Sequence, residues 1–460
     1  MTKNYSQNET SLSRRRLQHG SLPREVCLFW FRRDLRLHDN AGLFYALKEN
    51  KKVLPVFIFD QNILNSLNPR DLRVVFIHQT ISEIKKQLQN LGSDLLVFYG
   101  EPIEVFKNLV DKLPICSVYT NHDYEPKARL RDVNVEAYLK QKQIVFKSYK
   151  DQTLFEKDEI KTDAGNPYTV YTPYKKKYLS LLNDFYLKSY PNDLYQMNYY
   201  QNPMPDMTFY DRFPQLEDMG FKSCDAVFPE MCLSQTMLKK YAVDRDFPYL
   251  DHATSRLGLH LRFGTVSVRE LAREGKKYSD VWLSELVWRD FFMQILWHYP
   301  HVENSSFRPQ YEKIKWRDSD EDFNRWKNGE TGFPIVDAGM RELNETGHMH
   351  NRVRMIVASF LTKHLLQHWL RGERYFAEKL LDYDLSANNG NWQWAAGTGC
   401  DAAPYFRVFN PDAQTEKFDP EYKYIKKWVP EFGTSKQIKP MIDHKFARDR
   451  AIAEYKKGLS

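Results

Sequence analysis

Five short apolar runs, separated by stretches of helical spacing, dominate the first third of the chain. They are rich in Val, Ile, Phe and Tyr, which is typical of buried strands, and they cover residues 26–32, 52–60, 94–99, 115–121 and 144–148. Apolar residues three and four apart predict helices at residues 39–48, 72–91, 101–113 and 125–142. Strands that alternate with helices in this way predict a parallel sheet covered on both faces, a doubly wound α/β domain over residues 25–150.

The alternation ends near residue 150, and 460 residues are enough for two or three domains. Residues 151–232 have no clear periodicity and are rich in Pro, Asn and Tyr, so we interpret them as a long connector on the surface of both domains. Residues 233–455 have mainly helical spacing, which predicts an all-helical second domain. The polar residues 1–24 are interpreted as a disordered tail, with an organelle address as the alternative.

The charge and the aromatic content of the chain bear on whether it binds nucleic acid or a planar cofactor. Lys and Arg (67) exceed Asp and Glu (60), a mild excess that is compatible with a nucleic-acid partner without requiring one. Aromatic residues make up 15% of the chain, and their rings can stack on bases or on a planar cofactor, although core packing accounts for most of them.

Cysteine usage and hydropathy suggest where the protein works. The five cysteines form no CxxC pair and have no His at zinc-finger spacing, which predicts a reducing, cytoplasmic environment and no structural metal. No apolar run approaches the roughly 18 residues of a membrane span, so we expect no membrane partner. Nothing in the sequence indicates a coiled coil, and we expect a monomer.

Arginines gather directly after the first predicted strand, in residues 31–40 (FRRDLRLHDN). Ligands of doubly wound sheets bind at the carboxyl ends of the strands, so these arginines could hold a phosphate. The glycine-rich dinucleotide fingerprint is absent, which argues against an ordinary NAD site. An ion-pair network of Arg33, Asp34 and Arg36 that fixes the loop is the alternative, and we favour it slightly.

Two late stretches, residues 347–355 (GHMHNRVRM) and 382–394 (DYDLSANNGNWQW), place charged, amide and indole side chains where a helical core would have Leu, Ala and Val. Such groups are costly to bury without a partner, so the stretches predict a large, flat, charged ligand. Asn351, Arg354 and Met355 share one helical face. Trp392 and Trp394 would point about 200° apart on a helix, so we expect one to line the ligand cavity and the other to enter the interior.

Two earlier motifs are weaker. Residues 254–258 (TSRLG) precede a helical stretch, where backbone N–H groups can hold a phosphate, but Ser and Thr also cap helices routinely. In residues 281–289 (VWLSELVWR), Trp282, Glu285 and Arg289 share a face, with Trp288 at its edge. This face could be the floor of a pocket, and the alternative is an ordinary amphipathic helix with a Glu–Arg pair.

Together and in this order, over residues 26–430, the motifs resemble the photolyase/cryptochrome family of blue-light flavoproteins, and most closely its class I cyclobutane pyrimidine dimer photolyases. The resemblance implies an N-terminal α/β antenna domain and a helical domain that binds FAD non-covalently in a folded form. It also implies light-driven repair of UV-damaged DNA, in which photoexcited reduced FAD donates an electron to a flipped-out dimer and receives it back.

The resemblance assigns roles to individual positions. Arg354 would pair with Asp382, and Asn388 would lie beside flavin N5. The residues implied to contact FAD are Tyr241, Thr254, Ser255, Arg256, Leu257, Gly258, Trp282, Glu285, Arg289, Asn351, Arg354, Asp382, Asp384 and Asn388.

The implied substrate site overlaps this set. Glu285 would share a hydrogen bond with the thymine carbonyls, and two indoles would stack on the dimer. The implied catalytic residues are Glu285, Trp288, Met355, Asn388 and Trp394. The implied DNA contacts are Arg245, Glu285, Trp288, Asn351, Arg352, Arg407 and Gln414. The implied electron chain from the surface to the flavin is Trp316, Trp369 and Trp392.

The lesion type and the antenna are less sharply indicated. In (6-4) photolyases two histidines serve the active site; His350 matches the first, but Met355 stands at the second, which favours dimer repair. Folate-binding relatives have an Asn–Glu pair in the segment that corresponds to residues 124–131, where this chain has Lys127 and Ala128, which argues against a methenyltetrahydrofolate antenna. A deazaflavin, a second flavin or no antenna stays open. Two further functions also stay open: a cryptochrome-like photosensor, and an adenine-nucleotide-binding α/β enzyme with a helical accessory domain.

Overall fold

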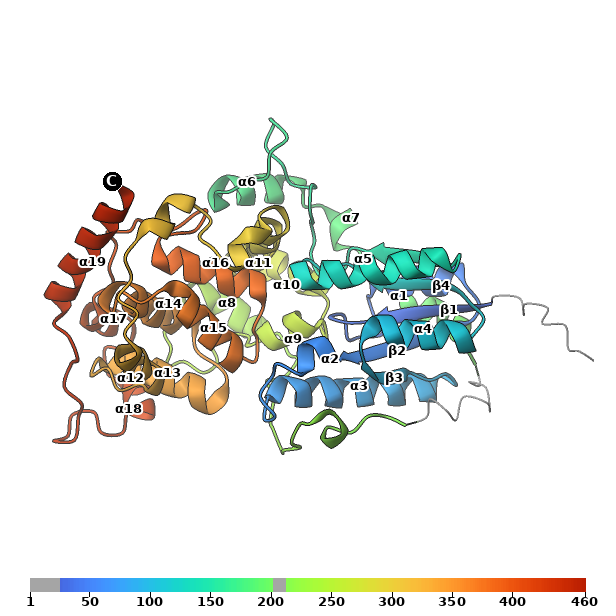
Figure 1. Cartoon of the computed structure of the whole chain (residues 1–460), viewed down its shortest axis with the longest axis horizontal. Coiled ribbons are helices and arrows are strands. Elements are labelled where there is room, and N and C mark those ends of the chain that lie inside the picture. The colour runs from blue at the N-terminus through green and yellow to red at the C-terminus, as the bar shows by residue number, and fades with distance from the viewer. Residues whose placement is uncertain (1–24, 202–211) are drawn as a thin grey trace, which may run out of the picture.

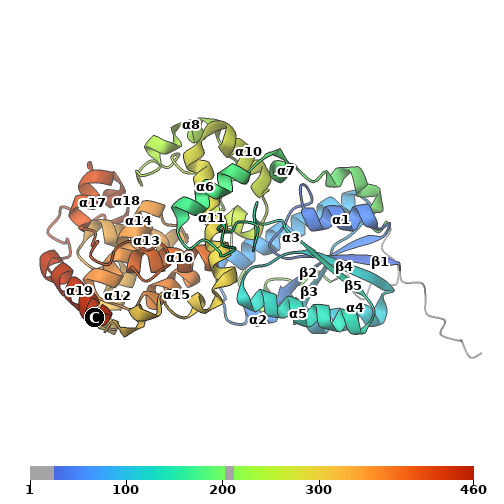
Figure 2. The same cartoon turned by 90° about the horizontal axis from the view of Figure 1, so that it is seen from above.

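The computed structural model describes residues 25–201 and 212–460 and has two lobes side by side (Figure 1). The lobe formed by the first part of the chain contains the sheet, and the other lobe is helical (Figure 2). The predicted tail, residues 1–24, lies outside the described residues.

The sheet has the doubly wound architecture predicted from the sequence. Its strands are β1 (Val26–Phe31), β2 (Val53–Asp60), β3 (Leu96–Gly100), β4 (Ile115–Asn121) and β5 (Val145–Tyr149). All neighbouring strands are parallel, in the order β3-β2-β1-β4-β5. Leu28 in the central strand pairs with Leu54 on one side and with Val118 on the other. The chain therefore winds outward from β1 in both directions.

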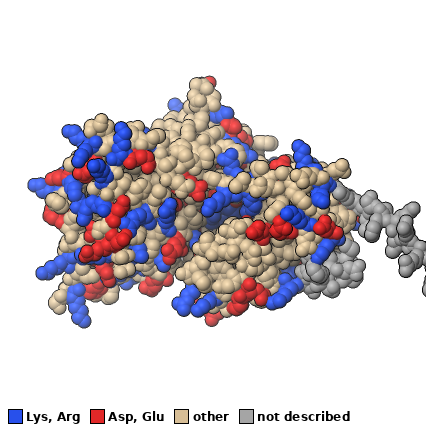
Figure 3. Space-filling view, in the orientation of Figure 1, with Lys and Arg blue, Asp and Glu red and all other residues tan. Residues whose placement is uncertain are grey.

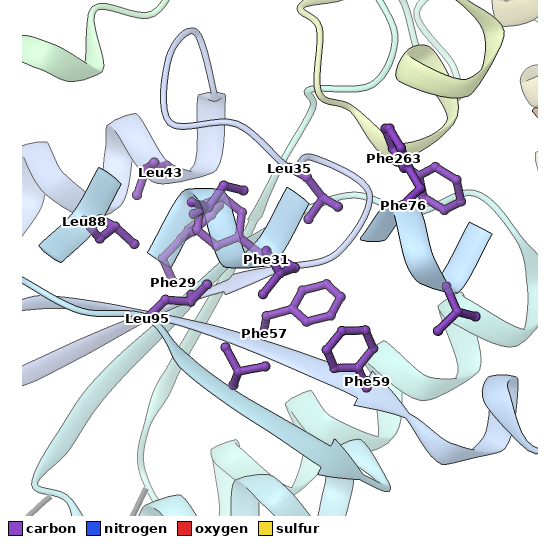
Figure 4. Packing of buried hydrophobic residues seen from close by; sticks show 14 of the residues in the cluster. Phe29, Phe31, Leu35, Leu43, Phe57, Phe59, Phe76, Leu88, Leu95 and Phe263 are labelled. Carbon is purple, nitrogen blue, oxygen red and sulfur yellow. The ribbon is translucent and has the colours of Figure 1, made fainter. Parts of the chain in front are cut away.

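Helices cover both faces of this sheet because side chains alternate along each strand. In β1, Cys27, Phe29 and Phe31 pack with α1 and α3, whereas Leu28 and Trp30 pack with α4 and α5. Figure 4 shows the first of these cores. The helices of this domain are α1 (Ala41–Glu49), α2 (Gln61–Leu64), α3 (Leu72–Asn90), α4 (Pro102–Lys112) and α5 (Pro126–Gln141).

The second domain is helical, as predicted. Its helix α16 packs against α11, α14 and α15, and these four surround the candidate site. The helices are α8 (Gln235–Asp244), α9 (Gly258–Phe263), α10 (Val268–Tyr278), α11 (Asp280–His298), α12 (Asp320–Asn328), α13 (Pro334–Thr346), α14 (Asn351–Ser359), α15 (Trp369–Lys379), α16 (Leu385–Ala396), α17 (Pro411–Phe418), α18 (Lys423–Trp428) and α19 (His444–Leu459). One π-helical turn, Phe360–His364, follows α14.

The connector is more deeply integrated than the surface segment predicted from the sequence. It contains α6 (Tyr171–Leu181) and α7 (Asp184–Leu187). Tyr171, Tyr174 and Tyr178 lie on one face of α6 and are buried in the core that contains α11. The buried positions that repeat with the helical period are all tyrosines. The hydroxyl of Tyr171 donates to the Ser284 carbonyl, and the hydroxyl of Tyr178 donates to the Asp290 carboxylate. Tyr is also common in loops, and Pro and Lys stand between these tyrosines, so the sequence pattern did not identify them as a buried face of a helix. The interpretation of the connector as a segment on the surface was therefore wrong.

Ion pairs fix the loop after β1, but the local network predicted for Arg33, Asp34 and Arg36 was wrong. Asp34 accepts from the Asn121 amide and the Arg32 backbone N–H, and the two arginines pair with carboxylates from other segments. Arg33 pairs with Glu125 at 2.9 Å and also with Asp384 of the helical domain. Arg36 pairs with Asp151 at 2.7 Å, and Arg269 of α10 pairs with the same carboxylate at 2.8 Å. Apolar packing continues across the junction, where Phe76 of α3 meets Phe263 of α9 (Figure 4). These contacts hold the helical domain in one position against the sheet.

Candidate functional site

A cavity opens between α14, α15 and α16 of the helical domain. It encloses about 580 Å³ of empty space, part of it open to solvent. Charged and amide groups lie on its wall beside aromatic and apolar ones. The lining residues are Asn351, Arg354, Met355, Ala358, Phe376, Leu380, Asp382, Tyr383, Asp384, Ala387, Asn388, Asn391, Trp392, Trp394 and Ala395. The two late motifs of the sequence therefore meet in one cavity, as predicted.

Asp384 begins α16 and ties the cavity to the α/β domain. One carboxylate oxygen accepts hydrogen bonds from the N–H groups of Ser386 and Ala387, which caps the helix. The other oxygen pairs with Arg33 and, at 3.3 Å, with Arg262. Burial alone would raise the pKa of Asp384, but the two arginines lower it well below its ordinary value. Asp384 is thus an ionised carboxylate that already has its partners.

Asp382 lies on the same wall and keeps one oxygen free. Its other oxygen accepts from Arg354 at 2.9 Å, and Arg354 also donates to the Met349 carbonyl. Burial would raise the pKa of Asp382, and the Arg354 charge reverses this and lowers it. The Oδ1 atom is buried and has no hydrogen-bond partner in the described part of the chain. A buried acceptor without a donor is costly, so this oxygen is suited to a ligand N–H or O–H group.

The loop of the TSRLG motif reaches this wall from the side of α9. A Cβ on Gly258 would lie 2.7 Å from the Asp382 carboxylate, so only glycine allows this approach. Arg256 has a positive φ of 51° and pairs with the exposed Asp251 at 3.2 Å. Thr254 and Ser255 are half-buried beside it. None of the five residues of this motif lines the cavity itself, and the loop meets the wall where Gly258 approaches Asp382.

Asn388 is oriented by a carboxylate that the sequence analysis overlooked. Its amide nitrogen donates to the carbonyl of Glu373 at 3.0 Å and to its side chain at 2.9 Å, which leaves the amide oxygen for a ligand donor. Burial raises the pKa of Glu373 to about 7. Glu373 belongs to an otherwise apolar stripe of α15 that includes Trp369 and Phe376, and a carboxyl group in such a stripe is a signal that could have identified it.

The two tryptophans of α16 differ in burial, as their spacing predicted, but both contact the cavity. Trp392 is 2% exposed and packs on Phe376 and Trp326 in the core, and it also lines the cavity. Trp394 is half-buried and lines the same cavity. The expectation that only one of them would line the cavity was therefore wrong, because the cavity extends inward to the Trp392 ring.

A smaller cavity adjoins the first and shares Trp394 with it. Its empty space is about 180 Å³. It is lined by Trp288, Phe292, Gly390, Trp394, Gly399, Cys400, Asp401 and Ala402. Two indoles on opposite helices, Trp288 of α11 and Trp394 of α16, thus lie at one opening, where a planar group could stack between aromatic walls.

Charged side chains connect the two regions at the surface. Glu285 of α11 pairs with Arg245 at the end of α8, and Arg352 of α14 pairs with Asp246 at 2.7 Å. Arg352 also reaches the Met355 sulfur and covers the Phe418 ring at 4.3 Å. Glu285, Arg245, Arg352 and Met355 are therefore linked in one rim by these contacts and by the pair of Arg245 with Asp246 at 3.8 Å.

Several predicted site residues lie away from both cavities. Tyr241 and Trp282 are buried in the core between α8, α10 and α11. Arg289 donates to the backbone carbonyls of Gln152 and Leu261, and burial lowers its pKa. Arg407 is exposed and Gln414 is half-buried on α17. In this structure Arg289 therefore fixes the domain junction.

The remaining predicted tryptophans lead away from the cavity. Trp369 is fully buried, and its indole N–H has no partner among the residues described. Trp316 is half-buried near the surface, beside His368 and Tyr455. The ring of His368 also packs on Trp369 at 5.9 Å, so Trp316 and Trp369 share a neighbour.

Metal clusters and membrane-spanning helices are both missing from the part of the chain that the structure describes. No group of three or more His, Cys, Asp or Glu side chains within residues 25–201 and 212–460 is placed to hold a metal ion. No helix in the same two ranges combines the length and apolar character that a bilayer crossing requires.

Comparison with known families and structures identifies the architecture. Residues 27–192 match the DNA photolyase family, and residues 282–438 match the FAD binding domain of DNA photolyase. The chain is 36% identical to the deoxyribodipyrimidine photo-lyase of Halobacterium salinarum, over 94% of this chain and 99% of the relative.

Two solved structures are similar over nearly the whole chain. A class III photolyase from Agrobacterium tumefaciens has a TM-score of 0.83 at 30% identity and covers 98% of this chain and 99% of its own. An archaeal photolyase from Sulfolobus tokodaii, solved with two FAD molecules, has a TM-score of 0.77 at 35% identity and covers 94% and 100%. The chain belongs to the photolyase/cryptochrome family, and its helical domain is the FAD-binding domain of that family.

Proposed function

We propose that the protein repairs cyclobutane pyrimidine dimers in DNA with light, as a deoxyribodipyrimidine photo-lyase. The observation that carries this proposal is the pair of adjoining cavities that share Trp394. One has the polar groups of a cofactor site and the other has the aromatic walls of a base-stacking site. The relative from Halobacterium salinarum bears the name of this enzyme.

The groups left without partners in the larger cavity suit FAD. The free oxygen of Asp382 can accept from a heterocyclic N–H, and the amide oxygen of Asn388 is available for a second donor. The loop that carries Gly258 approaches the same wall and can hold phosphates with Thr254, Ser255 and Arg256. When bound and reduced, FAD supplies light absorption and the one-electron donation to the dimer that opens its cyclobutane ring, after which the electron returns.

The protein's own part in the reaction is to hold the dimer. Trp288 and Trp394 stack on the flipped-out bases, and Met355 lines the cofactor side of the opening. Glu285 shares a hydrogen bond with the thymine carbonyls while negative charge develops there. Its present partner, Arg245, lies at the rim and turns to the DNA when Glu285 engages the lesion.

Phosphate contacts position the strand without reading its sequence. The residues proposed for these contacts are Arg245, Asn351, Arg352, Arg407 and Gln414. On the face shown in Figure 3, Lys and Arg side chains are spread over the helical lobe and interspersed with Asp and Glu. Affinity for undamaged DNA should therefore be modest and should fall with salt, because each contact releases counterions.

Trp392, Trp369 and Trp316 are proposed to carry an electron from the surface to oxidised FAD. Trp392 lines the cavity, Trp369 is buried in the same core as Trp392, and Trp316 is half-buried and packs against that core. This route restores the reduced cofactor and takes no part in opening the dimer ring.

The (6-4) lesion and the photosensor are weaker candidates for this chain. His350 accepts a hydrogen bond from the Arg352 N–H, and burial lowers its pKa to about 4. A neutral imidazole that caps α14 is a poor proton donor at neutral pH, which disfavours (6-4) repair. A photosensor requires no dimer site, yet the aromatic opening between Trp288 and Trp394 is present.

We further propose that the enzyme acts as a monomer in the cytoplasm. Five cysteines are free, and Cys224 and Cys232 are exposed, which suits a reducing compartment. We also propose that the α/β domain holds a second chromophore, whose identity stays open. The Sulfolobus tokodaii photolyase with two FAD molecules shows that a relative holds one.

The test is repair of a dimer-containing oligothymidine by the purified, reduced protein. Loss of dimers under blue light and none in the dark supports the function. Bound flavin without repair of dimer or (6-4) lesions would favour the photosensor, and an absence of flavin would reject the cofactor assignment. Glu285→Ala should reduce repair about tenfold or more while FAD content stays near wild type, because Glu285 faces the rim.

A further inference from the structure

One aromatic residue of the connector lies directly behind the proposed lesion site. Tyr171 is the first residue of α6, and its ring lies flat on the Trp288 indole, with ring centroids 3.4 Å apart and planes 7° from parallel. Figure 2 shows α6 lying against α11, the helix that carries Trp288. The Tyr171 ring therefore covers one face of the indole.

Both ends of Tyr171 are fixed. Its hydroxyl donates to the Ser284 carbonyl of α11 at 2.9 Å, and its backbone N–H donates to the Asp401 carboxylate at 2.9 Å. The ring edge meets Phe291 at 5.8 Å, and the residue is 8% exposed. Asp401 lines the same small cavity as Trp288, so the anchor of Tyr171 belongs to the cavity wall.

The indole of Trp288 is therefore held from behind. Phe291 meets it edge to face, and the Phe292 ring is nearly parallel to it, with centroids 5.4 Å apart and planes at 25°, while Trp288 and Phe292 both line the small cavity. A half-buried tryptophan without such support could populate more than one rotamer, and ordering it would reduce the affinity for a ligand. With Tyr171 in place, the ring is ready for a stacking partner.

We propose that Tyr171 is a positioning residue for dimer recognition, which acts by holding Trp288 in the orientation that stacks on a flipped-out dimer. This inference rests on the proposed repair function and adds a residue of the connector to its substrate site. The Tyr171 ring holds Trp288 through the stack, whereas the Tyr171 hydroxyl contributes only the hydrogen bond to the Ser284 carbonyl.

The experiment compares Tyr171→Leu, Tyr171→Phe and wild type in the FAD-loaded, reduced protein. The measurements are the dissociation constants for oligothymidine with and without a dimer, and the repair rate at saturating dimer. Tyr171→Leu should weaken dimer binding about tenfold, while binding of undamaged DNA, FAD content and the saturated repair rate stay within about twofold. Tyr171→Phe should restore most of the affinity because it keeps the stack.

Tyr174→Leu is the matched control. Tyr174 is buried on the same helix and packs on Phe291, away from Trp288, so its loss should lower thermal stability without changing the preference for dimers. Wild-type dimer preference in Tyr171→Leu would overturn the inference, as would an equal loss in Tyr171→Phe or a parallel loss of FAD and of undamaged-DNA binding. Failure of wild type itself to prefer dimers would instead reject the proposed function.

Discussion

The domain junction and the cofactor cavity are built from the same residue types but differ in how completely those residues are satisfied. At the junction, Arg36 and Arg269 both pair with Asp151, and Asp151 also accepts from the Ala41 N–H. In the cavity, Asp382 has a buried oxygen without a partner among the described residues. At the junction, both oxygens of the Asp151 carboxylate have donors within the chain, although Arg36 Nε is buried without a partner in the part of the chain that the structure describes. In the cavity, one carboxylate oxygen of Asp382 is left for a ligand donor.

One carboxyl group beside the cavity, that of Glu373, has its pKa shifted in the opposite direction from that of Asp151 at the junction. Burial would raise the pKa of Asp151, but Arg36 and Arg269 outweigh it and lower the pKa to about 2. Burial raises the pKa of Glu373 beside the cavity to about 7, since it has the Asn388 amide but no paired cation. A buried arginine–carboxylate cluster alone is therefore no sign of a ligand site, and a carboxylate oxygen without a donor in the described ranges, as in Asp382, is the better guide.

The largest effect is expected at the junction. Asp151→Ala removes the shared partner of two buried arginines and should lower the free energy of unfolding by about 3–5 kcal/mol, measured by urea titration. Asp158→Ala, which breaks an exposed pair with Lys161, is the control and should cost less than about 0.5 kcal/mol. Similar losses in the two variants would contradict the view that the junction holds the domains together.

Glu373→Gln should have a smaller, pH-dependent effect. A carboxyl group whose pKa is raised on folding stabilises the native state at pH below 4.5, and this contribution is lost as pH rises through about 7. The variant should therefore gain about 2–3 kcal/mol of stability relative to wild type between pH 4.5 and pH 8. The exposed Glu378→Gln on the same helix is the control. A pH-independent difference for Glu373→Gln would show that the carboxyl group is not held in this state.

Trp316→Phe should have the smallest effect on the fold and on repair. Trp316 is half-buried and distant from the junction, so we expect a stability change within about 1 kcal/mol. Photoreduction of oxidised FAD should slow at least tenfold, while repair by pre-reduced enzyme changes less than twofold. Trp428→Phe, also half-buried, should leave both rates unchanged. Equal losses of photoreduction and repair in Trp316→Phe would remove it from the electron chain.

Local patterns predicted the sheet closely. The strand predicted at residues 115–121 is β4 (Ile115–Asn121), because alternation and β-branched composition are local properties. The stretch 382–394 also predicted the cavity from local sequence. Burying its charged and amide side chains without a partner would cost free energy, so their presence in a helical segment indicates a ligand.

Pairings between distant segments could not be predicted in this way. Arg33 meets Asp384 from more than 300 residues away, and Arg289 meets the backbone carbonyls of Gln152 and Leu261. Every residue has a backbone carbonyl, so residue type and spacing do not indicate which carbonyl accepts a hydrogen bond from a distant arginine. Tyr171 was missed because tyrosine is as common in loops as in buried helical stripes, and only the folded α6 shows what it supports.

The most direct test of the contrast between junction and cavity is the stabilisation that added FAD gives to the apoprotein. At a concentration 100-fold above the dissociation constant, FAD should raise the free energy of unfolding of wild type by about 2.7 kcal/mol. Asp382→Asn should lose most of this gain, whereas Asp151→Ala, although less stable, should keep it in full. No gain in wild type, or an equal gain in Asp382→Asn, would contradict the conclusion that the cavity is completed by the cofactor.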